Sequence, residues 1–180
     1  MKRILEGKSV AAEKDSELLR DKRLIFYEED IDKINKVLEE FLKLSGSKSN
    51  LLIDKDGHLI TKAGQTGSYD LPTVSALVAG SFAATREMAR LLGEEEFSVL
   101  FHQGKRDNLQ LTLIGERTIL ATLFDNRTTI GMVRLYTKEA ATKLVKLFKE
   151  AQSHRGAPGK ETIGEKFGEE AKGRLDDFFG

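Results

Sequence analysis

The segment from Leu71 to Leu92 constrains the fold most, because it carries the signals of one long helix with two different faces. Asp70 stands at the N-cap position, Pro72 suits the first turn, and Gly93 follows the last helical residue. At 3.6 residues per turn, one broad side gathers the residues that we expect to face the core. They are Val74, Leu77, Val78, Ser81, Met88 and Leu92.

A second side of this predicted helix is lined mainly by small residues. They are Thr73, Ala76, Gly80, Ala83 and Glu87. A glycine in the middle of a helix costs roughly 1 kcal/mol relative to alanine, so we expect another surface to use the close approach that it permits. Two interpretations stay open at this point: the side packs on the chain's own sheet, or it binds a protein partner.

Hydrophobic periodicity predicts seven further elements around this helix. They are helices at 28–44 and 130–153 and strands at 51–53, 59–61, 98–103, 109–114 and 118–124. Gly115-Glu116 is predicted to be a two-residue hairpin loop, and Leu109, Leu111 and Leu113 alternate onto one face of their strand. The order α-β-β-α-β-β-β-α predicts an α/β fold with one five-stranded antiparallel sheet and helices packed against it.

The chain is predicted to have four parts. They are a mobile N-terminal extension at 1–24, a folded domain at 25–153, a flexible linker at 154–168 and an acidic-aromatic segment at 169–180. The last part contains Asp176-Asp177-Phe178-Phe179, and aromatic residues are useful at interfaces. It is interpreted as a docking segment, with a frayed end as the alternative.

Composition and motifs argue against several classes of function. The 29 basic and 29 acidic residues balance, so no overall charge favours nucleic acid or an anionic membrane. The chain has no cysteine and no long apolar run, and we expect a cytoplasmic protein without membrane insertion. His58, His102 and His154 are scattered, and no phosphate-binding loop occurs. We therefore expect no catalytic residue, cofactor or metal site, while Arg127 either stabilises its turn or reaches a partner's nucleotide.

Four segments, taken in order, resemble the bacterial MglB proteins of the roadblock/dynein light chain superfamily. They are residues 76–84, 91–97, 101–104 and 124–135, within a similarity that spans about 27–151. The resemblance implies a roadblock (Longin-like) fold. It also implies a homodimer, in which the third strands pair edge to edge and the second helices lie side by side.

The resemblance further implies a regulator of the Ras-like GTPase MglA in cell polarity and motility, enriched at a cell pole. One GTP-bound MglA binds each dimer, which activates hydrolysis by remodelling the GTPase switch regions without an arginine finger. The five small-side residues given above match the family's GTPase-facing positions, and Glu87 stands where relatives can have a small residue. The alternative is a roadblock scaffold that docks a GTPase, or another roadblock protein, without activating it.

A C-terminal segment in some members of this family reaches the GTPase and is tied to nucleotide exchange. In this chain the helix at 132–155 is locally basic, and Lys33 on the first helix adds to that surface. We expect the acidic-aromatic segment to dock, through Phe178 and Phe179, near Lys33 and Lys146 on these helices, on the GTPase, or on both in succession.

Overall fold

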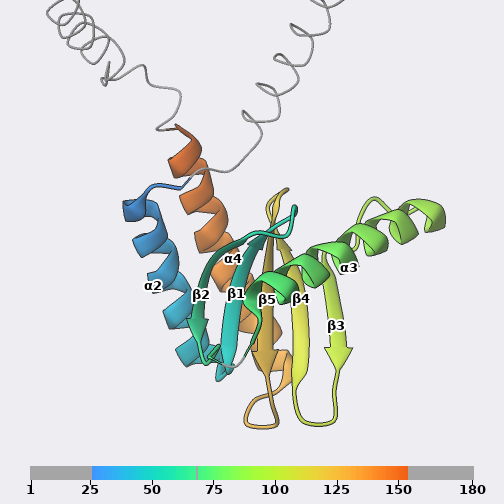
Figure 1. The fold of residues 1–180 in the computed structure, drawn as a ribbon, viewed down its shortest axis with the longest axis horizontal. Coiled ribbons are helices and arrows are strands. Elements are labelled where there is room, and N and C mark those ends of the chain that lie inside the picture. The colour runs from blue at the N-terminus through green and yellow to red at the C-terminus, as the bar shows by residue number, and fades with distance from the viewer. Residues whose placement is uncertain (1–25, 68, 154–180) are drawn as a thin grey trace, which may run out of the picture.

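The computed structural model of the chain describes residues 26–67 and 69–153, and it contains three helices and five strands in this part (Figure 1). In chain order they are α2 (Glu28–Ser45), β1 (Ser49–Asp54), β2 (Leu59–Gly64), α3 (Leu71–Leu92), β3 (Val99–Gln103), β4 (Asn108–Ile114), β5 (Thr118–Phe124) and α4 (Ile130–Ser153). The predicted order of elements is confirmed, with bounds within two or three residues of those expected.

The five strands form one antiparallel sheet in the order β2-β1-β5-β4-β3, as predicted. Strand β3 lies at one edge and pairs with β4, from Val99 opposite Thr112 to Gln103 opposite Asn108. Its other edge has no strand partner among the described residues. An exposed strand edge is a ready site for pairing with another chain.

The hairpin between β4 and β5 corrects one prediction, because its loop has three residues and not two. Ile114 pairs with Thr118, which leaves Gly115, Glu116 and Arg117 in the turn. Directly opposed residues lie on the same face of a sheet, so a two-residue loop would have paired Leu111 with a side chain of the other face. The longer loop pairs Leu111 with Ala121, which shares its face.

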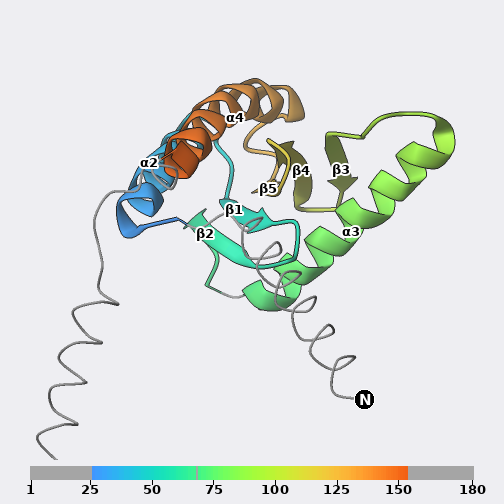
Figure 2. The same ribbon diagram turned by 90° about the horizontal axis from the view of Figure 1, so that it is seen from above.

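The sheet separates two helical layers, with α2 and α4 side by side on one face and α3 on the other (Figure 2). Alternate residues of strand β5 pack against the two helical layers. Leu120 and Phe124 belong to the core beneath α2 and α4, whereas Ile119 and Ala121 belong to the core beneath α3. The alternation predicted for β4 and β5 is therefore confirmed, and so is the placement of the first and last helices opposite α3.

Helices α2 and α4 run antiparallel. The Nζ of Lys143 lies 2.6 Å from an Oε of Glu40 near their middle, and the rings of Phe26 and Phe148 lie 5.4 Å apart at one end. The beginning of α2 and the end of α4 therefore meet at the same end of the helical layer. Residue Lys33 of α2 and residue Lys146 of α4 both lie toward this end.

Residues 1–25, 68 and 154–180 are outside the described part. The predicted extension, linker and acidic-aromatic segment, including Phe178 and Phe179, fall there. Within the described ranges no helix combines the length and hydrophobicity needed to cross a membrane.

Candidate partner-binding surface

Helix α3 carries the candidate surface, and local signals fix both of its ends. A carboxylate oxygen of Asp70 accepts a hydrogen bond from the backbone N–H of Thr73 at 3.4 Å, and the other accepts one from the Thr73 hydroxyl at 2.6 Å. Pro72 occupies the first turn, where no N–H is needed. Gly93 ends the helix in the left-handed conformation, with φ of 78°. The helix start and stop predicted from the sequence are confirmed.

The core-facing stripe of α3 differs from the predicted one. Its buried residues are Ser75, Val78, Ala79, Phe82 and Ala89. Three residues expected in the core are exposed to solvent, Leu77 at 66%, Met88 at 54% and Leu92 at 67%. Met88 and Leu92 are exposed because the C-terminal half of α3 extends beyond the β3 edge, where no sheet lies beneath it (Figure 1), whereas Leu77 lies on a side of the helix that is turned away from the sheet.

The five residues predicted for partner binding lie together on one side of the buried stripe. We call Thr73, Ala76, Gly80, Ala83 and Glu87 the small-residue flank, and all five are exposed. Part of this flank faces the chain's own β1–β2 turn, because a Cβ on Gly57 would lie 3.1 Å from the Cα of Ala76. Ala83 lines a cavity of about 200 Å³ with Lys55 and Asp56 of the same turn. The self-packing interpretation thus holds at Ala76 and the neighbouring Ala79.

Gly80 is the part of the flank that the chain itself does not use. A Cβ built on Gly80 would meet no atom within 4 Å, so nothing in the described structure requires a glycine there. Glycine lowers the stability of a helix relative to alanine, and no contact among the described residues offsets this loss at Gly80. The position therefore favours close approach by a surface from another chain.

Thr73 and Glu87, at the two ends of the flank, are engaged locally. The Thr73 hydroxyl bonds to Asp70, as described above. The carboxylate of Glu87 accepts hydrogen bonds from Arg90, with Nε at 3.1 Å, and this interaction raises the pKa of Arg90. A partner that binds the flank meets this ion pair at one end and the capped first turn at the other.

A second exposed surface lies on the other side of the buried stripe. We call Leu77, Met88 and Leu92 the apolar flank of α3. On the edge strand β3, Leu100 lies on the α3 face of the sheet, whereas the exposed Val99 and Phe101 lie on the opposite face, where Phe101 stacks on Phe124. Sequence reasoning missed this surface because it assigned the leucines and the methionine to the core. No local signal in the sequence separates the two, because apolar and small residues occur at helical spacing on more than one side of α3.

Several charged groups elsewhere in the described part form ion pairs. Arg127 donates from Nε to Asp125 at 2.9 Å, and its backbone N–H donates to the same carboxylate at 3.0 Å. This contact lowers the pKa of Asp125 and raises that of Arg127, which favours the turn-stabilising interpretation of Arg127. The Nδ1 of His58 lies 3.2 Å from Asp54, and His102 is exposed on β3. No cluster of three metal-ligating side chains occurs among the described residues.

Comparison with known proteins agrees with this architecture. The family model of the Roadblock/LC7 domain matches residues 33–124. MglB of Myxococcus xanthus is 43% identical, over 66% of this chain and 96% of that one, with a TM-score of 0.64. The gliding protein MglB of Thermus thermophilus is 35% identical, over 71% and 96%, with a TM-score of 0.66. A structure of MglB with a tetrameric arrangement is also 35% identical over the same shares, with a TM-score of 0.67. The chain therefore belongs to the Roadblock/LC7 family, as a protein of the MglB type.

Proposed function

We propose that this chain is a homodimeric activator of a small Ras-like GTPase of the MglA type, acting in bacterial cell polarity and motility. The observation that carries the proposal is the open position of Gly80 on the exposed small-residue flank of α3. A long helix that presents such a position at its surface is suited to close packing against a protein. The similarity to MglB proteins supplies the class of partner.

The proposed homodimer uses the edge of β3 and the apolar flank of α3. Pairing of two β3 strands continues the sheet across the dimer and gives the exposed strand edge a partner. The apolar flank supplies hydrophobic area of the kind that subunit interfaces bury. The similarity to an MglB with a tetrameric arrangement supports self-association of such chains.

The proposed GTPase site is the surface formed by the two α3 helices of the dimer. Each helix contributes its small-residue flank, and a single GTPase in the GTP-bound state spans the pair. Stimulation works by selecting the hydrolysis-competent arrangement of the GTPase switch regions through contacts made better in that state. In this proposal residues 169–180 assist nucleotide exchange, and the protein gathers at a cell pole.

The proposal does not require a catalytic arginine from this chain. Arg127 is held by Asp125, and the Nε of Arg86 lies 4.0 Å from Glu96. An arginine finger acts by entering the active site of the GTPase, where it is worth about 10³-fold or more in hydrolysis rate. Charge stabilisation in the transition state is left to groups of the GTPase itself.

Multiple-turnover GTP hydrolysis by the cognate GTPase, measured with and without the full chain, tests the proposal. We expect the rate to rise with added protein and to saturate at one GTPase per dimer. Binding without stimulation would instead identify a scaffold. Absence of binding to the GTP-bound form, for a folded dimer, would contradict both functions.

A further inference from the structure

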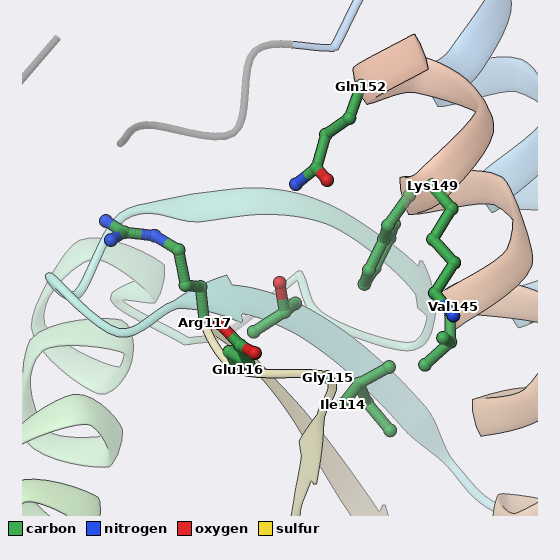
Figure 3. Close-up of a pocket in the computed structure, with 9 residues that line it drawn as sticks. Ile114, Gly115, Glu116, Arg117, Val145, Lys149 and Gln152 are labelled. Carbon is green, nitrogen blue, oxygen red and sulfur yellow. The ribbon is translucent and has the colours of Figure 1, made fainter. Parts of the chain in front are cut away.

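A cavity of about 260 Å³ lies on the α4 side of the molecule, away from the candidate partner-binding surface. The β4–β5 hairpin forms one wall, and the last turns of α4 form the other (Figure 3). Its apolar lining comes from Ile114, Val145 and Phe148. The cavity is thus a recess with a partly apolar lining, at the end of the helical layer where α4 leaves the described structure.

The polar lining of the cavity favours an anionic group beside an apolar one. Lys149 borders the cavity on the α4 side, and Arg117 borders it on the hairpin side with its guanidinium group pointing away from α4 (Figure 3). Glu116 also lines the cavity. A guanidinium nitrogen of Arg117 lies 3.5 Å from a carboxylate oxygen of Asp56, so Arg117 already has an ion-pair partner. Lys149 forms no ion pair within the described ranges. Its ammonium group is therefore available to a carboxylate that approaches the mouth of the cavity.

Thr118 also borders the cavity, beneath its surface. This residue lines the cavity and is fully buried, yet its hydroxyl has no hydrogen-bond partner in the described structure. A buried polar group without a partner costs free energy, and native proteins usually satisfy it. Because this hydroxyl is closed to solvent while the cavity is open, it lies beneath the cavity wall and contributes no contact to a group bound in the cavity.

We propose that the cavity binds the chain's own segment Asp176-Asp177-Phe178-Phe179, with one phenyl ring inside and a carboxylate on Lys149. The cavity volume selects a single ring, because about 150 Å³ already holds a benzene molecule. Neighbouring side chains of an extended peptide point to opposite sides, so the second ring stays outside. Asp177 accompanies Phe179 on the inward side, or Asp176 accompanies Phe178.

The position of the cavity in the chain favours binding within one molecule. Gln152 lines the cavity, and the next residue, Ser153, is the last described one. Phe178 follows Ser153 by 25 positions, and a flexible linker of this length has a root-mean-square span of about 25–30 Å. Such a tether gives an effective concentration in the millimolar range. Burial of one phenyl ring raises the equilibrium constant for docking by a factor of roughly ten to a hundred.

The docking site proposed here differs from the one expected from the sequence. The expectation placed the aromatic pair near Lys33 and Lys146, both exposed on the helical surface. Lys146 does not line the cavity, whereas Lys149, one turn further along α4, does. The inference also stands apart from the proposed GTPase regulation, because it concerns one chain in the absence of any partner.

A single tryptophan reporter tests the inference, because the chain contains no tryptophan. Phe178→Trp and Phe179→Trp are compared with Phe167→Trp, which places the reporter in the predicted linker, away from Asp176 and Asp177. We expect blue-shifted emission and several-fold weaker acrylamide quenching at position 178 or 179, and an exposed reporter at 167. The protection should be independent of protein concentration.

Charge reversals on α4 then show where on the domain the segment docks. Lys149→Glu should remove the protection, whereas the matched Lys146→Glu variant should keep it, and far-UV circular dichroism verifies the fold of each. Equal quenching at 167, 178 and 179 would overturn docking. Protection lost with Lys146→Glu but kept with Lys149→Glu would overturn the cavity as the docking site. Protection that grows with protein concentration would mean docking on a second copy, and so would overturn binding within one chain.

Discussion

Gly57 in the β1–β2 turn and Ala76 in α3 approach so closely that a Cβ on Gly57 would lie 3.1 Å from the Cα of Ala76. Gly57 also has φ of +92°, in the region that favours glycine. The turn therefore packs directly on the helix that carries the candidate partner-binding surface. This contact fixes the height of the N-terminal half of α3 above the sheet.

Gly57→Ala should destabilise the protein, because the new methyl group meets helix backbone that cannot move aside as a side chain can. Because alanine is also disfavoured in the left-handed backbone conformation of this position, we expect the free energy of unfolding to fall by about 1–3 kcal/mol. Gly67→Ala is the matched control, since a Cβ there meets nothing within 4 Å and its φ is not positive. Urea unfolding at equal protein concentrations compares the two. Equal midpoints would show that the turn is free to shift away from α3.

Substitution of Gly80 should separate stability from binding. Gly80→Ala meets no atom of its own chain and should raise the free energy of unfolding by about 0.5–1 kcal/mol. The same variant should weaken GTPase binding, and Gly80→Arg should abolish it while the dimer stays folded. Size-exclusion chromatography with light scattering, followed by pull-down of the GTP-bound GTPase, measures both. Normal binding by a folded Gly80→Arg dimer would refute the assigned surface, and loss of the dimer would place Gly80 between the subunits.

The apolar flank of α3 should hold the dimer together. Leu77→Glu and Met88→Glu each put a charge on a surface that the proposed interface buries, so we expect monomers at micromolar concentration. Leu135→Glu is the control, because Leu135 is an exposed leucine on α4, in the opposite layer. Analytical ultracentrifugation gives the oligomeric state of each variant. Unchanged dimers of both α3 variants would remove the apolar flank from the interface.

Most of the fold was predictable because its signals are local. Asp70 caps the first turn of α3, Pro72 suits that turn, and Gly93 ends the helix in the left-handed conformation. Each of these preferences acts within a few residues. The strands β4 and β5 alternate strictly, so their two faces could be read from the sequence. The length of the hairpin loop between them was not predictable in this way, because register depends on which cross-strand partners share a face.

The orientation of α3 shows where such reasoning ends. Its sequence contains apolar residues on more than one side, and periodicity cannot tell which side meets the sheet. Burial depends on how far the helix projects past β3, and that distance is set by the whole domain. The cavity between Arg117 and Lys149 was missed for a similar reason. Its two walls are far apart in sequence and meet only through packing of α4 on the hairpin.

Acid should remove the stabilising contribution of the Asp125–Arg127 pair. The hydrogen bonds from Arg127 hold the pKa of Asp125 below its usual value, so the ionised carboxylate favours the folded state. This contribution is fully present above the usual aspartate pKa of about 4 and is lost as the pH falls through the lowered value. The stability difference between the native chain and Asp125→Asn should therefore shrink below about pH 4. Thermal unfolding from pH 7 to pH 2 measures it, with Asp32→Asn on α2 as the control. A difference that persists unchanged to pH 2 would contradict this role of the pair.

No single arginine of this chain should be essential for stimulated GTP hydrolysis. Arg86 and Arg106 are exposed, and Arg127 is held by Asp125, so these three are the arginines to examine. If the dimer acts by selecting a competent conformation of the GTPase, each arginine-to-alanine variant keeps most of its stimulation at saturating concentration. Loss of a true arginine finger lowers the turnover rate by about 10³-fold or more while binding persists. Turnover must therefore be measured at saturation, with binding measured separately, so that a weakened complex is not mistaken for lost catalysis. Collapse of turnover for one variant with intact binding would assign that arginine to the transition state and would replace conformational selection as the mechanism.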